Sequence, residues 1–304
     1  MFTHFLSSFV TDLPIAAVPI QAQGLEHAGI VTNSILVGAI VVLGITWFVR
    51  RGMKDATLIP GKKQNLCEFL VEFLYKQVEG IVGVKVAPRA FPLLATLFIF
   101  IIVSNWFGLI PGVGTIGWDS HHTSYLTAGH IETSLLRPAT ADLNMTLGMA
   151  LCAFIVWIWI TLRELGEHET HGKGSLPWQL VMGVWGFFKH LFFPKGGLKG
   201  VIVIPLAFIF ALVGVIELVS IAFRPVSLSL RLLGNIFAGE TLLHTMMTLG
   251  ETLGLGAFGS FVTSVVFPLP FYFMEILVGA LQAVVFTLLC AVYIKLSTTH
   301  EEEH

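Results

Sequence analysis

The stretch SLSLRLLGNIFAGE, residues 227–240, places one permanently charged side chain in an apolar setting. Arg231 lies among leucines, and the nearest acidic residues are Glu240, nine positions later, and Glu217, fourteen positions earlier. A guanidinium stays protonated at any biological pH. Because no acid lies on its own helical turn, Arg231 could instead meet a carboxylate that arrives from another subunit. A fixed cation would favour the ionised form of that acid.

Side chains that exchange protons lie close to Arg231 in the sequence. Glu240 and His244 are four residues apart, and Glu275 follows in the next apolar run, where it shares a helical face with Gln282. A charge at the centre of a bilayer costs at least ~2.5–3.5 kcal/mol on insertion scales, so such residues are functional candidates. Together they indicate a proton path that is interrupted by a fixed cation.

Structural roles for the same side chains remain as alternatives. Arg231 could form an ion pair with Glu217, Glu240 or Glu275 inside one folded bundle. Glu240 and His244 have the i,i+4 spacing of a simple helical pair. Arg224, seven residues before Arg231, favours a place at the inner membrane face, where its side chain snorkels or pairs.

The elements that position these residues must be membrane-embedded. The 304 residues are 55% hydrophobic and only 12% charged, with a mean hydropathy of +0.83. Soluble domains carry about 25% charged residues, so we expect an integral membrane protein. The net charge of −2 and the lack of a basic block argue against a nucleic-acid partner. Cys67, Cys152 and Cys290 are far apart and predict no disulfide framework.

The apolar runs predict an all-α fold with a single membrane domain over residues 31–304 and an extramembrane arm over 1–30. Helical periodicity in residues 64–84 indicates an amphipathic surface helix. The last two runs are too long for upright spans, which need about 20 residues, so we expect a strongly tilted hairpin. The predicted spans are 31–49, 91–110 and 143–162, and the hairpin arms are 201–249 and 256–296.

The basic residues predict the orientation in the membrane. Arg50, Arg51 and Lys54 follow the first span, and positive charges concentrate on the cytoplasmic side of membrane proteins. We therefore expect the N-terminus outside and the C-terminus in the cytoplasm.

Four segments resemble a known family. SLSLRLLGNIFAGE, with Glu217 before its arginine and LQAVVFTLLCAVYIKLS near the chain's end, resembles subunit a of F-type ATP synthases. RPATADLNMTL (137–147) and SNWFGLIPG (104–112) look like two further segments of that family. The resemblance covers about residues 30–304. It implies the same fold, with the long tilted hairpin curving around a rotating ring of c subunits.

The resemblance also implies roles for individual residues. Arg231 matches the essential arginine that faces the ring, and Asn235 and Gln282 match polar residues close to it. Glu240 matches the half-channel acid. Glu217 matches a second acid of the proton path. Glu275 stands where some members have histidine and others an acid. The candidate proton-translocation set is thus Arg231, Glu240, Glu217, Asn235, His244, Glu275 and Gln282.

A family member would be a stator subunit of the bacterial inner membrane that gives protons two offset half-channels to the ring. The implied partners are the c-subunit ring, the b-subunit peripheral stalk, the rest of the complex and membrane lipid. No Walker-type phosphate loop occurs, so we expect no ATP chemistry, cofactor or metal in this chain. The choice between proton and sodium coupling, the ring size and the direction of net turnover depend on other chains and conditions.

Two other classes of protein are weaker alternatives. A stand-alone ion channel or secondary transporter would fit the composition, but no inverted repeat is visible. A membrane metalloenzyme would use histidines, yet His168 and His171 lack the HExxH spacing that places two ligands on one helical face. The remaining histidine candidates, in the loop 112–140, are His121, His122 and His130.

Overall fold

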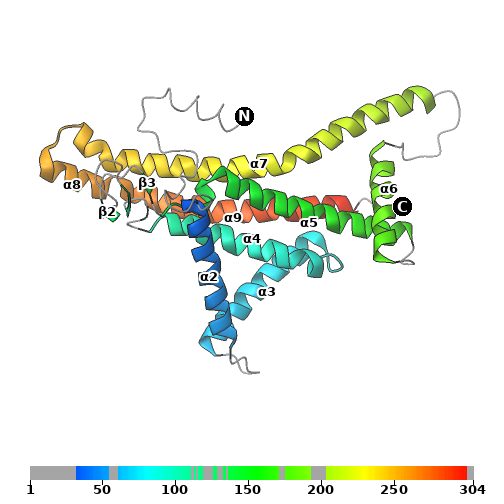
Figure 1. Cartoon of the computed structure of the whole chain (residues 1–304), viewed down its shortest axis with the longest axis horizontal. Helices are drawn as coiled ribbons and strands as arrows, with labels where there is room; N and C mark the ends of the chain where they lie inside the picture. The colour runs from blue at the N-terminus through cyan, green and yellow to red at the C-terminus, as the bar shows by residue number, and fades with distance from the viewer. Residues whose placement is uncertain are drawn as a thin grey trace. The chain divides into compact units, whose positions relative to one another are not determined.

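The computed structural model of the chain describes most of the predicted membrane domain. The described residues are 32–54, 61–110, 113, 116–118, 126–128, 133–134, 136–170, 175–192 and 203–299. The predicted arm over 1–30 lies outside them. The α-helices, labelled in Figure 1, are α2 (Asn33–Met53), α3 (Lys62–Val82), α4 (Ala87–Gly108), α5 (Leu143–Glu169), α6 (Leu176–Phe192), α7 (Val203–Thr252), α8 (Gly256–Val266) and α9 (Pro268–Thr299). A short 3-10 helix, η1 (Ala139–Ala141), precedes α5.

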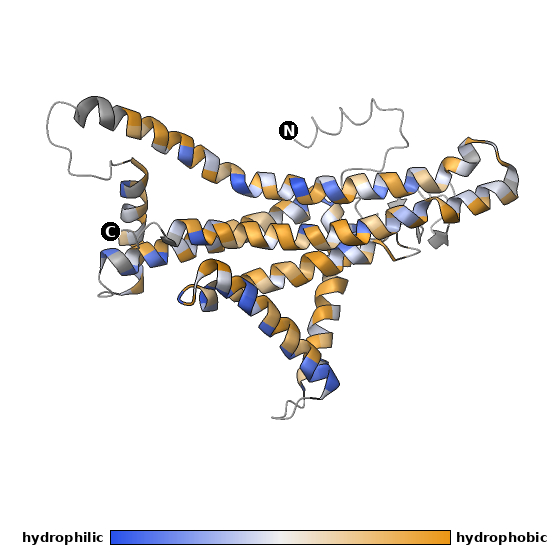
Figure 2. Ribbon diagram, turned by 180° about the vertical axis from the view of Figure 1, so that it is seen from behind, coloured by the Kyte–Doolittle hydropathy of each residue, from blue (hydrophilic) through white to orange (hydrophobic). Residues whose placement is uncertain are grey.

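Apolar helices dominate the described part of the chain. Five segments are long and apolar enough to cross a membrane: Asn33–Met53, Ala87–Gly108, Leu143–Glu167, Ile209–Gly250 and Phe258–Ser297. Figure 2 shows hydrophobic residues along α4, α7 and α9 and more frequent hydrophilic ones on α3. The predicted class, an all-α integral membrane protein, is therefore confirmed.

Three short strands interrupt the helical pattern between α4 and α5. They are β1 (Ile116–Trp118), β2 (Leu126–Ala128) and β3 (Thr133–Ser134). They pair antiparallel in the order β2-β1-β3, with Ile116 opposite Ala128 and Gly117 opposite Ser134. Sheet hydrogen bonds satisfy polar backbone groups that a helix would otherwise satisfy.

The two arms of the last apolar third differ in continuity. α7 is a single helix that continues through Pro225. At ~1.5 Å per residue, its 50 residues are about 75 Å long, more than twice the ~30 Å core of a bilayer. The second arm is divided at Phe267 into α8 and α9, and Pro268 opens α9 at the position where a missing N–H costs nothing. Gly254 and Gly256 have φ of +65° and +72°, which suits the turn after α7.

The chain forms two compact units, and several helices contribute residues to both. Unit 1 comprises residues 1–71, 96–149 and 229–286, and unit 2 comprises 72–95, 150–228 and 287–304. Each unit therefore takes one part of α7 and one part of α9. The two units are described separately below.

Unit 1 has a small-residue contact where α2 meets η1. Val37 on α2 and Ala139 and Ala141 on η1 are buried. A side chain at Gly38 would lie 3.0 Å from the Met145 side chain and 3.7 Å from that of Ala139. A glycine at this place lets the two elements approach closely.

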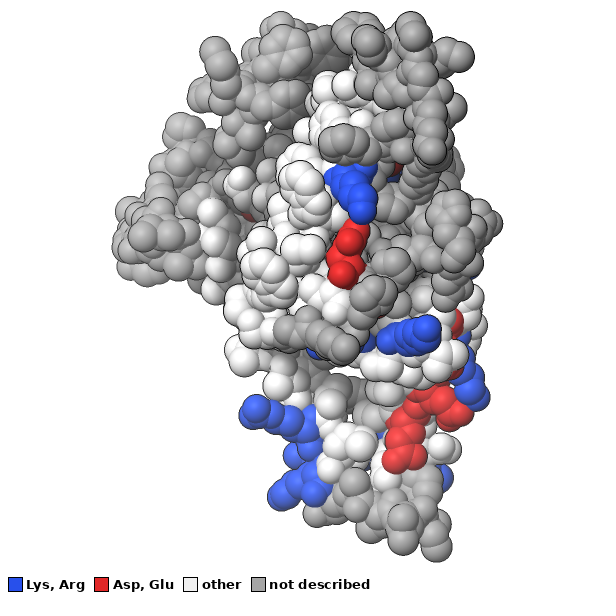
Figure 3. Space-filling view, turned by 90° about the vertical axis from the view of Figure 1, so that its right-hand side faces the viewer, with Lys and Arg blue, Asp and Glu red and all other residues white. Residues whose placement is uncertain are grey.

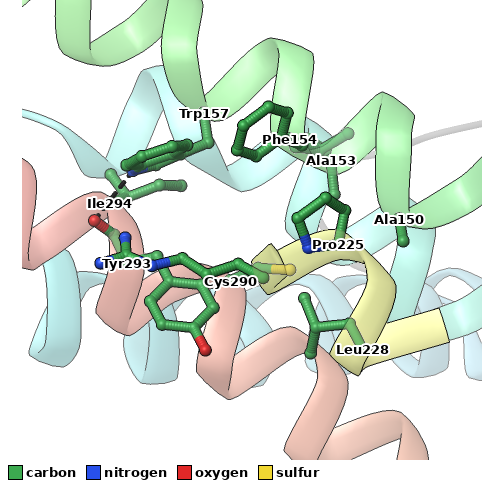
Figure 4. A pocket seen from close by; sticks show the side chains of 11 residues that line it. Ala150, Ala153, Phe154, Trp157, Pro225, Leu228, Cys290, Tyr293 and Ile294 are labelled. Carbon is green, nitrogen blue, oxygen red and sulfur yellow. Dashed lines mark hydrogen bonds between the residues drawn. The ribbon is translucent and has the colours of Figure 1, made fainter. Parts of the chain in front are cut away.

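Unit 2 is held by side-chain hydrogen bonds between α5 and α9. Trp157 Nε1 donates to the Tyr293 carbonyl at 2.8 Å, drawn as a dashed line in Figure 4, and Thr161 Oγ1 donates to Ser297 Oγ at 2.8 Å. On α6, Gly183 lies against the Leu162 carbonyl of α5, so a side chain there would collide with backbone. These contacts fix the packing of α5 in this unit.

Ion pairs add to unit 2. The Arg89 guanidinium contacts Glu164 and Glu167 of α5, and Arg163 Nε lies 3.0 Å from Glu167 Oε1. Lys189 Nζ of α6 lies 3.3 Å from Glu169 Oε1. In the upper part of Figure 3 a basic side chain touches an acidic one. The partly exposed pairs each contribute little alone, but shared partners on α5 make a network.

Candidate functional site

Arg231 is an exposed cation on the unit 1 part of α7. Leu232 and Leu233, the next two residues, are buried. Among the described residues, its side chain makes no hydrogen bond or ion pair. The alternative pairs with Glu217, Glu240 or Glu275 are therefore not formed there.

A hydrogen bond on the opposite side of α7 fixes the direction in which Arg231 points. Ser229 is fully buried, and its Oγ lies 3.0 Å from Thr146 Oγ1 at the start of α5. At 100° per residue, Ser229 and Arg231 are about 200° apart around the helix. With Ser229 anchored inwards, Arg231 must face outwards.

The helix surface next to Arg231 is exposed and includes small residues. Gly234 is exposed, and a Cβ placed there would have no heavy atom within 4 Å. Leu230 and Ala238 are exposed on either side of it along the helix. We call Leu230, Arg231, Gly234 and Ala238 the open strip. Its two small residues, Gly234 and Ala238, leave room for another helix to approach closely.

The amides Asn235 and Gln282 join α7 to α9 close to Arg231. Asn235 Nδ2 donates to Gln282 Oε1 at 2.7 Å, and Gln282 is buried. The Gln282 Nε2 has no hydrogen-bond partner among the described residues. The Gln282 amide nitrogen is therefore free to donate a hydrogen bond to a water or another group.

Glu275 is buried against the backbone of α7. Its side chain is 5% exposed, and its carboxyl group occupies the place that a Cβ on Gly239 would take. Gly239 directly precedes Glu240. The absence of a side chain at Gly239 therefore allows Glu275 of α9 to lie against the turn of α7 that carries Glu240.

Two side chains of α4 fix the rotation of α9 at this place. Asn105 Nδ2 donates to the Gly279 carbonyl at 3.0 Å, and Trp106 Nε1 donates to the Ile276 carbonyl at 3.1 Å. Glu275 lies on the same turns of α9. Ser104 Oγ and Asn105 Oδ1 are buried without a partner among the described residues. Buried polar atoms normally have a partner in protein or water, so these mark a polar interior.

Glu240 has a same-chain partner that the sequence analysis did not assign to the site. Arg137 is 3% exposed, and its Nη2 lies 3.4 Å from Glu240 Oε2. The sequence signal was present, because Arg137 is the single basic residue in the loop 112–140 and opens the family-like segment 137–147.

Asp142 is a second residue that the sequence analysis did not place. It is 1% exposed and accepts a hydrogen bond from the Asn144 N–H at 3.1 Å. Burial raises the pKa of the Asp142 carboxyl, while the Asn144 bond and the charge of Arg137 act in the opposite direction. Arg137 is thus in electrostatic contact with two acids, Glu240 and Asp142.

Two further predicted site residues, His244 and Glu217, are exposed on α7. His244 lies one turn after Glu240, and Glu217 lies on the unit 2 part of the helix. Among the described residues neither side chain has a hydrogen bond or ion pair. Of the histidines weighed as metal ligands, His121, His122, His130 and His171 lie outside the described residues, as does the side chain of His168.

The cluster brings together groups that can pass protons and a cation that cannot. The carboxyl groups of Glu240, Glu275 and Asp142 are of the kind that can exchange protons, and the amides and hydroxyls beside them can donate and accept hydrogen bonds. Arg231 faces outwards, and no opposite charge is paired with it in the described part of the chain. The arrangement suits proton transfer to an acceptor outside the chain.

Comparisons with known proteins point in the same direction. The family described as ATP synthase A chain matches residues 31–295. A protein named ATP synthase subunit a from Mycobacterium ulcerans is 30% identical over 273 residues, which are 89% of this chain and 87% of the relative. Proteins of the same name from Protochlamydia amoebophila and Dinoroseobacter shibae are 29% and 30% identical, over 89% and 91% of this chain and 82% and 89% of their own lengths.

Proposed function

Because the chain belongs to the ATP synthase A chain family, we propose that it is the proton-translocating stator subunit a of a rotary ATP synthase. In this role it offers protons two offset half-channels and couples their flow to the rotation of a ring of c subunits. It carries out no ATP chemistry of its own. Its other partners are the b-subunit peripheral stalk and membrane lipid.

The proposal rests on one observation: the Arg231 guanidinium has no ion-pair partner in the described part of the chain. A guanidinium at membrane depth is costly unless it meets an opposite charge. Arg231 meets none among the described residues, and the open strip beside it leaves space for another helix. A carboxylate on a ring subunit would satisfy the cation, and the ring's rotation would bring one carboxylate after another.

The outer half-channel would use the polar interior of unit 1. Glu240 and Glu275 lie at adjacent positions of α7 and α9, and the Asn235–Gln282 bond lies towards Arg231. The buried Oγ of Ser104 and Nε2 of Gln282, without partners in the described part of the chain, suit a chain of waters. A proton that passes this route would neutralise a ring carboxylate, which could then face lipid.

The inner half-channel would begin on the unit 2 part of α7, where Glu217 is exposed. After almost a full turn of the ring, the carboxyl would lose its proton there as it approaches Arg231, whose charge favours the ionised form. The same charge would block direct leakage between the half-channels. A membrane potential adds ~2.3 kcal/mol per charge per 100 mV as driving force.

The proposed topology follows from the basic flank of α2, which ends in Arg50 and Arg51. By the charge asymmetry of membrane proteins, this end faces the cytoplasm of a bacterial inner membrane and the N-terminus lies outside. α3 would then lie on the cytoplasmic surface, and the α7–α9 hairpin would cross the bilayer at a strong tilt.

The experiment is the substitution Arg231→Gln in the complete ATP synthase. We expect normal assembly and the loss of ATP-driven proton pumping in inverted membrane vesicles. A neutral amide lacks the positive charge that favours the ionised ring carboxylate, so the ring carboxyl would keep its proton. Arg163→Gln, which removes a guanidinium from unit 2, should pump normally. Near-normal pumping by the assembled Arg231→Gln complex would overturn the proposal.

A further inference from the structure

Arg137 is buried, charged and placed at the turn that leads into η1. Its side chain is 4% exposed, whereas the Glu240 side chain that it contacts is 31% exposed. The Nη2–Oε2 distance of 3.4 Å lies within the range of an ion pair. The contact therefore connects the loop before α5 to the half-channel acid of α7.

The charged and titratable groups near Glu240 come from the ends of η1, from α9 and from α7 itself. Arg137 and Asp142 flank η1, Glu275 of α9 lies against the neighbouring Gly239, and His244 is exposed one turn further along α7. Among these groups Arg137 is the permanent cation, and the acids outnumber it. The charge of Arg137 is thus shared between the Glu240 and Asp142 carboxyls.

Proton transfer through Glu240 must change how the Arg137 charge is divided between the Glu240 and Asp142 carboxyls. When a proton binds a Glu240 carboxylate oxygen, the acid becomes neutral and the charge-assisted bond from Arg137 weakens. The buried guanidinium still has Asp142 beside it, so its charge remains compensated. When the proton moves on, the ionised Glu240 carboxylate binds Arg137 again.

We propose that Arg137 is a positioning residue of the proton path, which holds the ionised Glu240 carboxylate in place and releases it on protonation, with Asp142 as the alternate counter-charge. The inference rests on the proposed function and adds a device to it. It also explains why a permanently charged side chain is buried in a loop.

The test is a double-mutant cycle of pumping rates in the complete complex, with Arg137→Gln, Glu240→Gln and the double variant. We expect Arg137→Gln to slow ATP-driven proton pumping about tenfold, as for a lost hydrogen bond to a charged group, and to change its pH profile. Arg137→Lys should restore most of the rate, because it keeps the charge. The double variant should pump no more slowly than Glu240→Gln alone.

The outcomes separate the inference from the proposed function. Normal pumping by Arg137→Gln, or effects that multiply in the double variant, would overturn the role of Arg137. Normal pumping by Glu240→Gln would instead contradict the proposed function. If Arg137→Gln prevents assembly, Arg137→Met, which keeps the length of the side chain, replaces it in the same cycle and must give the same result. Arg163→Gln, outside unit 1, is the control.

Discussion

Two arginines of α7, one in each unit, differ in how their charges are satisfied. Arg224 in unit 2 lies between aromatic rings, 5.3 Å from the centre of Trp157 and 4.5 Å from that of Tyr293. The apolar pocket that these residues line is shown in Figure 4. Arg231 in unit 1 is exposed and has no partner among the described residues. The same residue type on one helix thus contacts aromatic rings of its own chain in one place and has no such partner among the described residues in the other.

The interiors of the two units show the same contrast. The buried side-chain atoms that we find without partners, such as Ser104 Oγ, Thr140 Oγ1 and Gln282 Nε2, all belong to unit 1. In unit 2, by contrast, the Trp157 indole and the Thr161 hydroxyl are both hydrogen-bonded to α9. An incompletely satisfied interior costs stability, which proteins accept mainly at functional sites.

After the loss of pumping expected for Arg231→Gln, the largest effect is expected from Gly239→Ala in unit 1. The new methyl group would overlap the Glu275 carboxyl and push it out of its place. An overpacked interior typically costs about 1–3 kcal/mol of folding stability. Because the Glu275 carboxyl would also be misplaced, we expect pumping to fall about tenfold. Gly148→Ala on α5, where a Cβ meets nothing within 4 Å, is the matched control and should pump normally. If Gly239→Ala pumps as well as the control, the position of Glu275 is irrelevant to proton transfer.

A smaller and different effect is expected from Arg224→Met in unit 2. The substitution keeps the apolar stem but removes two cation–π contacts, each worth about 0.5–2 kcal/mol. The thermal unfolding temperature of the purified complex should fall, while pumping at low temperature stays within about twofold of normal. A loss of pumping at unchanged thermal stability would show that Arg224 belongs to the proton path, and the contrast with Arg231 would break down.

The smallest effects should come from single hydroxyl bonds, one in each unit. Ser229→Ala removes the bond to Thr146 that directs Arg231 outwards, and Thr161→Val removes the bond to Ser297. Each should lower the free energy of unfolding by about 1 kcal/mol, as seen in thermal or denaturant unfolding. Only Ser229→Ala should also slow pumping, by about twofold. Equal pumping by the two variants would mean that the Ser229 anchor does not control Arg231.

The sequence was sufficient for the parts of the account that depend on local chemistry. Hydropathy predicted an all-α membrane protein, and the isolation of Arg231 from acids on its own turn suggested a cation without a same-chain partner. Helical periodicity also placed Glu275 and Gln282 on one face, and both are buried. The family resemblance is confirmed by the match over residues 31–295.

The pairings between distant segments could not be predicted in this way. Periodicity shows which face of a helix is polar, but not which segment packs against it. Arg137 contacts Glu240 across 103 positions of the chain, and Trp157 and Tyr293 reach Arg224 from other helices. The role of Gly239 depended on the place of Glu275 on another helix. Each of these contacts needed the three-dimensional structure.

The central claim is that Arg231 is left open for a carboxylate of a moving neighbour. The most direct measurement is an experimental structure of the assembled complex that resolves the surroundings of this side chain. The account predicts a carboxyl of a small ring subunit facing the guanidinium across the open strip, at hydrogen-bonding or single-water distance. A guanidinium bound to a carboxylate of its own chain, or facing lipid with no adjacent subunit, would contradict it.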